Sequence, residues 1–187
     1  IHRVLVDPLH SHIVYAAAHG NAWAPSKDRG VYKTYDGGQT WENILYVNDT
    51  TGCADLVMDP NNSQRILAAM YHYHREPYHF TSGGKGSGLH ITLDGGKTWT
   101  RLTDKQGLPE GELGRIGLAF APGNSKVVYA LIESAKTALY RSNDGGMNWF
   151  QVTDKGVGDR PFYYHELYVD PTNENHLIYL HSTVSES

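Results

Sequence analysis

Short apolar segments, separated by turn-forming residues, run along the whole chain. Four of them follow a proline-containing turn and have the length of a β-strand: residues 13–17, 66–70, 127–132 and 177–180. The preceding turns are Asp7-Pro8, Asp59-Pro60, Ala121-Pro122 and Asp170-Pro171. Proline presets φ and aspartate bonds back to the backbone, so each turn favours a chain reversal between two strands. The pattern predicts an all-β chain of short antiparallel strands.

A second repeat alternates with the first. It reads TYDGGQTW at 34–41, TLDGGKTW at 92–99 and SNDGGMNW at 142–149. The aspartates of this repeat recur roughly every 50 to 60 residues, which suits a four-stranded blade with its loops. Within one unit we expect an inner strand, a proline turn, a second strand, a long loop, a third strand, the Asp-Gly-Gly turn and a fourth strand.

The units predict a segment of a β-propeller with about three and a half four-stranded antiparallel blades. We place the blades at approximately 1–47, 54–102 and 114–152, with the start of a further blade at 162–187. Propellers typically close a ring of 4 to 8 blades, and open sheet edges favour aggregation. The chain is therefore expected to be part of a larger propeller, whose remaining blades, or another copy of the chain, close the ring.

The Asp-Gly-Gly turns carry residues with clear architectural roles. The aspartate carboxylate accepts backbone N–H bonds inside the hairpin, and the glycines supply positive φ. The tryptophan that follows covers apolar area between neighbouring blades. The structural set is Asp36, Gly38, Trp41, Asp94, Gly96, Trp99, Asp144, Gly146 and Trp149.

These three turns resemble the Asp-box, or bacterial neuraminidase repeat, with the pattern Ser/Thr-x-Asp-x-Gly-x-Thr-Trp. The third departs from it at Asn148, where threonine is expected. The wider sequence is similar to bacterial propellers of the sortilin-like, glycosyl hydrolase-like type, in the stretches 29–34, 55–60, 83–89, 113–119 and 160–164. The resemblance implies a secreted or periplasmic protein with more than three blades. It does not imply one activity, because function is grafted onto folds at sites.

Composition removes several classes of function. The 187 residues carry a net charge of −4, so no basic footprint for nucleic acid is present. No apolar run approaches the roughly 20 residues of a membrane-spanning helix. The lone Cys53 excludes an internal disulfide framework. We expect no cofactor.

Candidate ligand-binding residues gather in the loops at the end of the blades opposite the Asp-Gly-Gly turns. Functional loops usually cluster at one end of a rigid scaffold. The candidates are Trp23, Tyr71, His72, His74, Arg75, Arg115, Tyr164 and His165. Aromatic faces that stack and polar groups that orient suit a glycan or a protein ligand. His72 and His74 share one face of a strand, but they lack an obvious third ligand, so no metal site is predicted.

An enzymatic alternative needs two carboxylates at glycosidase separation. The candidate catalytic residues are Asp55, Glu112 and Glu133. Arg115 could bind an anionic ligand, or it could form an ion pair with Asp55. Acids held in ion pairs with Arg75, Arg115 or Arg160 would argue against catalysis.

The preferred interpretation is an extracytoplasmic propeller segment that acts as a ligand-binding or scaffold module. The alternative is part of a carbohydrate-active glycoside hydrolase. A third possibility, self-association through open sheet edges, follows from the incomplete ring.

Overall fold

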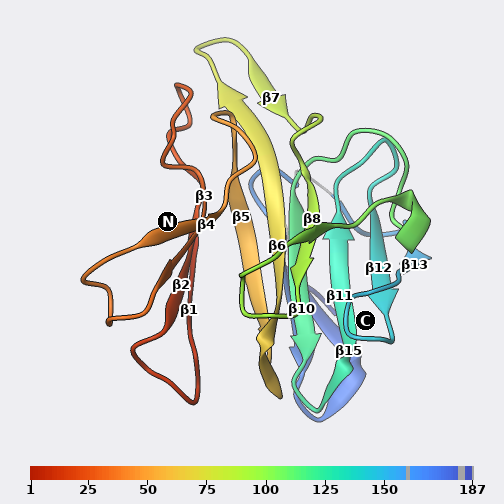
Figure 1. Ribbon diagram of the computed structural model, residues 1–187. Helices are drawn as coiled ribbons and strands as arrows, with labels where there is room; N and C mark the ends of the chain where they lie inside the picture. Colours follow the sequence, from red (N-terminus) through yellow and green to blue (C-terminus); the bar gives the residue numbers. More distant parts are fainter. Residues whose placement is uncertain (159–160, 181–183, 187) are drawn as a thin grey trace.

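The computed structural model describes residues 1–158, 161–180 and 184–186. It consists of antiparallel β-sheets arranged side by side like the blades of a fan (Figure 1). The predicted all-β propeller segment is therefore confirmed. None of the helices in the described part of the chain has the length and apolar character needed to cross a bilayer.

Each of the first three blades pairs its strands in chain order, from the inner strand outwards. Blade 1 comprises β1 (Arg3–Val6), β2 (Val14–Ala18), β3 (Gly30–Thr34) and β4 (Glu42–Leu45). Blade 2 comprises β5 (Thr51–Asp59), β6 (Asn62–Arg75), β8 (Gly88–Thr92) and β9 (Thr100–Arg101), with β7 (Phe80–Ser82) as an additional strand on β6. Blade 3 comprises β10 (Ile116–Ala121), β11 (Asn124–Ile132), β12 (Ala138–Ser142) and β13 (Phe150–Thr153).

The fourth sheet has three strands within the described residues. These are β14 (Glu166–Asp170), β15 (Asn173–Leu180) and β16 (Val184–Glu186), paired in that order. The sequence pattern predicted the first two. The third is too short and polar, as Val-Ser-Glu, to stand out from its surroundings.

Strand β6 is longer than its apolar segment suggested. Residues 71–75 were expected in a loop, but they continue the strand, and residues 73–75 pair with β7, with Tyr73 opposite Ser82. The alternation of aromatic and histidine residues explains this extension, because Tyr71 and Tyr73 are both buried on one face. A turn at Glu76–His79, closed by a 2.8 Å bond between Glu76 N–H and the His79 carbonyl, ends the hairpin.

The Asp-Gly-Gly turns are built by one repeated set of hydrogen bonds. In the second turn the Thr92 hydroxyl donates to Asp94 at 2.7 Å and accepts from Gly96 N–H at 2.9 Å. Asp94 also accepts from the Thr98 hydroxyl at 2.6 Å. In the third turn the side-chain amide of Asn148 donates to Asp144 at 2.8 Å, so it replaces the threonine contact.

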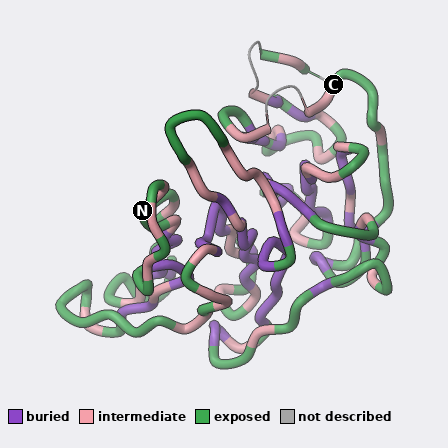
Figure 2. Tube along the Cα trace, turned by 90° about the horizontal axis from the view of Figure 1, so that it is seen from above, coloured by how far each residue is buried: buried purple, intermediate pink, exposed green. Residues whose placement is uncertain are grey.

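Neighbouring blades pack face to face through apolar side chains, and these faces form the buried layers of the molecule (Figure 2). Trp149 is 5% exposed between blades 2 and 3, whereas Trp41 of blade 1 is 43% exposed. The expected cover between blades therefore holds for Trp149 and not for Trp41. No blade among the described residues precedes blade 1.

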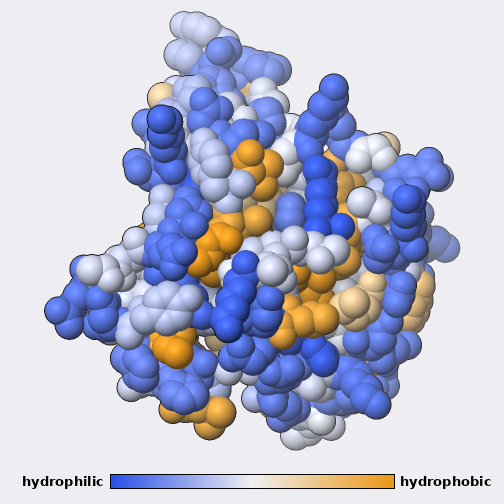
Figure 3. Space-filling model, in the orientation of Figure 1, coloured by the Kyte–Doolittle hydropathy of each residue, from blue (hydrophilic) through white to orange (hydrophobic). Residues whose placement is uncertain are grey.

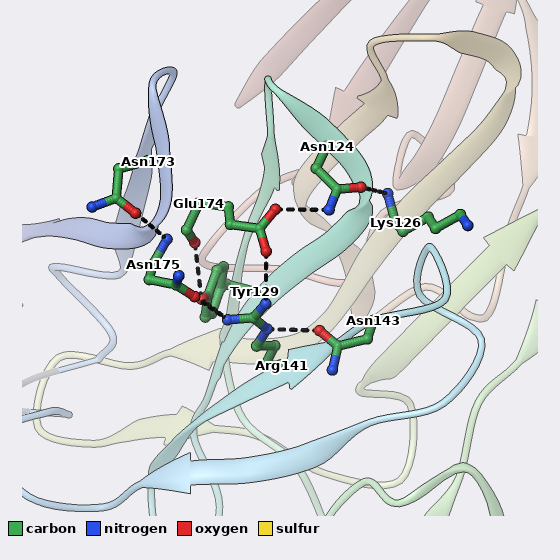
Figure 4. A network of polar contacts seen from close by, with 8 residues as sticks. All are labelled: Asn124, Lys126, Tyr129, Arg141, Asn143, Asn173, Glu174 and Asn175. Atoms are coloured by element: carbon green, nitrogen blue, oxygen red, sulfur yellow. Dashed lines mark hydrogen bonds and ion pairs between the residues drawn. The ribbon is translucent and has the colours of Figure 1, made fainter.

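Polar contacts reinforce these junctions at their outer ends. Between blade 3 and the fourth sheet, Arg141 donates to the Glu174 carboxylate at 3.1 Å, and the Tyr129 hydroxyl donates to the Glu174 carbonyl at 3.0 Å (Figure 4). Between blades 1 and 2, Tyr15 and Lys33 both donate to the Gly95 carbonyl, at 3.0 and 2.8 Å. A strand residue of one blade thus fixes a turn of the next.

The turn hydrogen bonds predict how substitutions at Thr92 change stability. Thr92→Val removes the buried hydroxyl while keeping the side-chain shape, so it leaves the Gly96 N–H without its acceptor. We expect the free energy of unfolding in urea to fall by about 1–3 kcal/mol. Thr92→Ser is the matched control, because Ser142 occupies the same position in the third turn and makes the same bonds. Equal losses in both variants would show that the hydroxyl is not what stabilises the turn.

Candidate functional site

The upper end of the molecule in Figure 1, where β7 projects, gathers loops from all four sheets. The inner strands β1, β5, β10 and β14 start at this end, and the Asp-Gly-Gly turns lie at the other. Backbone bonds tie the loops together: Arg75 N–H donates to the Ala22 carbonyl at 2.8 Å, and Gly84 N–H donates to the Leu113 carbonyl at 3.1 Å. The upper end is therefore a connected surface built on several blades.

An aromatic cluster forms the centre of this end. We define it as His19, Tyr71, Tyr73, Phe80 and Phe162. The rings of His19 and Tyr73 stack with centroids 4.1 Å apart, and those of Phe80 and Phe162 lie 3.8 Å apart. The cluster joins blades 1 and 2 to the segment that leads into the fourth sheet.

Exposed aromatic side chains surround the cluster. Trp23 is 58% exposed, and Tyr78, Tyr163 and Tyr164 are also exposed. Figure 3 shows that the surface near this end is largely hydrophilic, so these rings stand among polar neighbours. Such a surface offers flat apolar faces next to hydrogen-bonding groups, which suits glycans and peptide segments alike.

Two arginines lie against the aromatic rings. Arg29 is fully buried, lies 5.2 Å over the Tyr73 ring, and donates to the carbonyls of His19 and Asn21 at 3.1 and 2.5 Å. It fixes the loop that presents Trp23. The Arg75 guanidinium lies 5.8 Å from the centre of the Trp23 ring and 6.0 Å from that of Phe162. Cation–π contacts of this kind order both partners.

Two histidines, the half-buried His19 and the buried His165, lie beneath the site. Burial, together with nearby Arg115, lowers the pKa of His19 to about 3. Burial also lowers the pKa of His165 to about 3, although its Nε2 lies 2.6 Å from the Leu131 carbonyl. Both rings are therefore neutral at physiological pH, and neither adds positive charge to the upper end.

The candidate acids are held by the architecture to different degrees. Asp55 is buried, forms an ion pair with Arg3 at 3.0 Å, and accepts the backbone N–H of Leu118 at 2.9 Å. Its ion-pair partner is thus Arg3, and not Arg115 as the sequence suggested. The reason is the course of β1, which brings Arg3 beside β5.

Glu133 accepts the Ser82 hydroxyl at 2.9 Å and the Arg115 backbone N–H at 2.7 Å. Glu112 is exposed. Both glutamates line a polar hollow of about 470 Å³, which His79, Ser82 and Gly114 also line. This hollow is the place where two of the three candidate acids meet.

Arg115 lies near the axis-facing ends of the inner strands. Its guanidinium donates to the Phe162 carbonyl at 2.6 Å and lies 3.3 Å from Nε2 of His2. Burial lowers the pKa of Arg115 from its ordinary value. The bond to the Phe162 carbonyl therefore holds that member of the aromatic cluster in place.

The structure distributes the predicted ligand-binding residues over three settings. Trp23, Arg75 and Tyr164 reach the surface of the upper end, whereas Tyr71 and His165 are buried beneath it. The hydroxyl groups of Tyr71 and Ser82 form a hydrogen bond of 2.7 Å. His72 and His74 are half-buried on the opposite face of β6.

The histidine pair gathers no further ligands. His74 lies 3.8 Å from Glu76, and in the described ranges no group of three or more histidine, cysteine, aspartate or glutamate residues is placed to hold a metal ion. Arg160 lies outside the described residues.

Several residues of the upper end were not singled out by the sequence. Arg29 lies before β3, Phe80 begins β7 and Phe162 precedes β14, and only the fold brings them against Tyr73. The alternation at 71–74, tyrosine then histidine, was the available signal, because it predicts one aromatic face of a strand.

Comparisons with solved structures identify the architecture. An ancestral GH74 enzyme matches with a TM-score of 0.64 and 19% identity, over 97% of this chain and 22% of that one. The Niastella koreensis GH74 enzyme matches with a TM-score of 0.63 and 18% identity, over 97% of this chain and 27% of that one. YCF48 bound to D1 peptide matches with a TM-score of 0.53 and 19% identity, over 99% of this chain and 52% of that one.

The chain is part of a β-propeller. It spans about a quarter of the length of the GH74 enzymes and about half of YCF48. No protein-family model and no curated protein matches the sequence.

The lowered pKa of His165 predicts a pH dependence of stability. The unfolded state binds a proton near pH 6.5, while the folded state binds one only near pH 3, so stability is full above pH 6.5 and falls as the pH decreases between these values. As the pH is lowered through this window, the free energy of unfolding of the wild type should decrease by about 1.4 kcal/mol per pH unit more than that of His165→Gln. Parallel pH profiles of the two proteins in denaturant titrations would contradict a neutral, buried His165.

Proposed function

We propose that this chain is a segment of an Asp-box β-propeller that acts outside the cytoplasm as a ligand-binding or scaffold module, with a glycan or a protein as ligand. The observation that carries the proposal is the aromatic cluster with Arg29 and Arg75. It places exposed rings and an oriented guanidinium on one rigid surface.

The physical setting of this surface favours recognition. Tyr71 and Tyr73 of the cluster below are buried, and arginines contact the cluster, so the exposed rings above it need little further ordering when a ligand binds. Trp23 and Arg75 are the residue types that dominate binding energies at interfaces. YCF48, which has a related fold, was solved with a peptide bound.

Asp55 argues for a scaffold role of the central acids. The carboxylate has one oxygen facing Arg3 and the other facing Leu118 N–H, so it links blades 1, 2 and 3. A catalytic acid or nucleophile needs freedom to exchange protons or bonds with a substrate. Both carboxylate oxygens of Asp55 are already engaged in contacts that join blades.

The binding proposal predicts the effect of two substitutions. In screens of a glycan array and a peptide array, the wild-type protein should retain a discrete set of ligands. Trp23→Ala and Arg75→Ala should each weaken binding to these ligands by roughly tenfold or more, because tryptophan and arginine are the residue types whose truncation costs most at interfaces. Tyr35→Ala is the matched control, because Tyr35 is a similarly exposed aromatic residue on the first Asp-Gly-Gly turn. Equal binding by all four proteins would remove the upper end as the ligand site.

The second candidate function is part of a glycoside hydrolase. Glu112 and Glu133 favour it, because they line one polar hollow, and two of the fold neighbours are GH74 enzymes.

Hydrolysis predicts a different experiment. Glu112→Gln should abolish release of reducing sugar from a polysaccharide and leave retention of that polysaccharide intact, since the amide keeps the side-chain size. Glu110→Gln, on the same exposed loop, is the control. Absence of reducing-sugar release by the wild type across polysaccharides that it binds would exclude the enzymatic function for this chain.

A further inference from the structure

Strand β7, which projects from the upper end, pairs along one edge with β6 and with no other described strand (Figure 1). The bond of 2.9 Å from Gly83 N–H to the His72 carbonyl marks a hydrogen-bonded pair of this ladder. In an antiparallel ladder such pairs alternate with pairs that exchange no bonds. The register therefore turns the backbone N–H and carbonyl groups of Phe80 and Ser82 away from β6, where no described residue bonds to them.

The same edge already accepts a backbone partner one step further along the chain. Gly84, the next residue to face outward, donates its N–H to the Leu113 carbonyl at 3.1 Å and forms a single antiparallel bridge with that residue. The approach is close, because a Cβ on Gly83 would lie 2.7 Å from the Leu113 carbonyl oxygen. The blade 3 segment then leaves the edge, since Gly114 N–H bonds to the Glu133 carbonyl at 2.8 Å. Pairing thus stops at this bridge and leaves the rest of the edge open.

The polar hollow of about 470 Å³ adjoins the open part of this edge. Residues 79–84 line it from the β7 side, and residues 112–114 and 133–135 line it from blade 3. Ligand pockets commonly measure about 300–1,000 Å³. Unpaired N–H and C=O groups on an edge are a template for another strand, and peptides that add to such an edge gain affinity from main-chain hydrogen bonds. An extended peptide therefore suits both the space and the bonding groups of the hollow.

The charge of the hollow favours a basic segment. Glu112 and Glu133 line it, no lysine or arginine is among its described lining residues, and neither glutamate forms an ion pair within the described part of the chain. The Ser82 hydroxyl lies 2.9 Å from both carboxylate oxygens of Glu133. A residue paired opposite Ser82 places its side chain on the same face of the sheet. That position lies beside Glu133.

We propose that the open edge of β7 binds an extended protein segment as an added β-strand, with a lysine or arginine opposite Ser82 and beside Glu133. The segment residues opposite Phe80 and Ser82 each exchange N–H and carbonyl bonds with β7. The proposal rests on the proposed binding role of the upper end, and it names the ligand as a basic peptide segment.

Peptide arrays probed with the native polypeptide that contains these residues test the preference for charge. The probes are randomised octapeptides with lysine fixed at a central position, and the same set with glutamate there. The lysine set should be retained roughly fivefold or more above the glutamate set, because like charges at the hollow oppose binding. Equal retention of the two sets, or retention of neither, would overturn the inference.

Backbone methylation of a retained peptide tests strand pairing. Methylation of the lysine's own N–H should weaken binding by roughly tenfold or more, because that N–H donates to the Ser82 carbonyl. Methylation of the following residue's N–H, which points away from β7, should leave the affinity unchanged. Similar effects of the two methyl groups would show that the peptide does not bind as a strand on this edge.

A substitution in the hollow separates this inference from the general binding function. Glu112→Gln should weaken binding of the lysine peptides by roughly twofold to fivefold, a modest loss because Glu112 is exposed. Glu110→Gln, exposed on the same loop, is the control and should bind as the wild type does. Peptide retention that Trp23→Ala lowers, but that neither Glu112→Gln nor the exchange of lysine for glutamate changes, would overturn this inference and leave the binding function of the upper end standing.

Discussion

Burial of both faces of each sheet is the constraint on which this structure depends. A four-stranded blade has apolar side chains on two faces, and it can exclude water from them only by packing between two other blades. Leu67, at the centre of blade 2, illustrates this, because it contacts the turn glycine of blade 3 and belongs to the core between the two blades. Stability is therefore shared between neighbours, as in other repeat proteins.

The repeated turn could be predicted from the sequence because its interactions are local. Thr92, Asp94 and Thr98 lie within seven positions of one another, and their hydrogen bonds follow from side-chain type and spacing. The same reasoning predicted the strand order and the number of complete blades. Each of these features depends on residues within a single blade.

The candidate site was less predictable because its contacts join distant parts of the chain. Arg3 and Asp55 are separated by a whole blade, and Arg115 reaches the carbonyl of Phe162 across another. The sequence predicted aromatic, histidine and arginine residues at the upper end. It could not tell which arginine neutralises Asp55, because that depends on how closely the inner strands approach the axis. The burial of His165 could not be predicted either, since a histidine in a loop pattern resembles a surface residue.

The arginines at the upper end differ in whether their donors are already engaged with the protein. Arg3 and Asp55 form an ion pair, and the guanidinium groups of Arg29 and Arg115 donate hydrogen bonds to backbone carbonyls. These groups hold blades and loops in register. Arg75 differs, because its guanidinium lies beside the exposed ring of Trp23. A cation held against an exposed ring retains donors for a ligand while the fold beneath it stays fixed, and such preorganisation is what a binding surface needs.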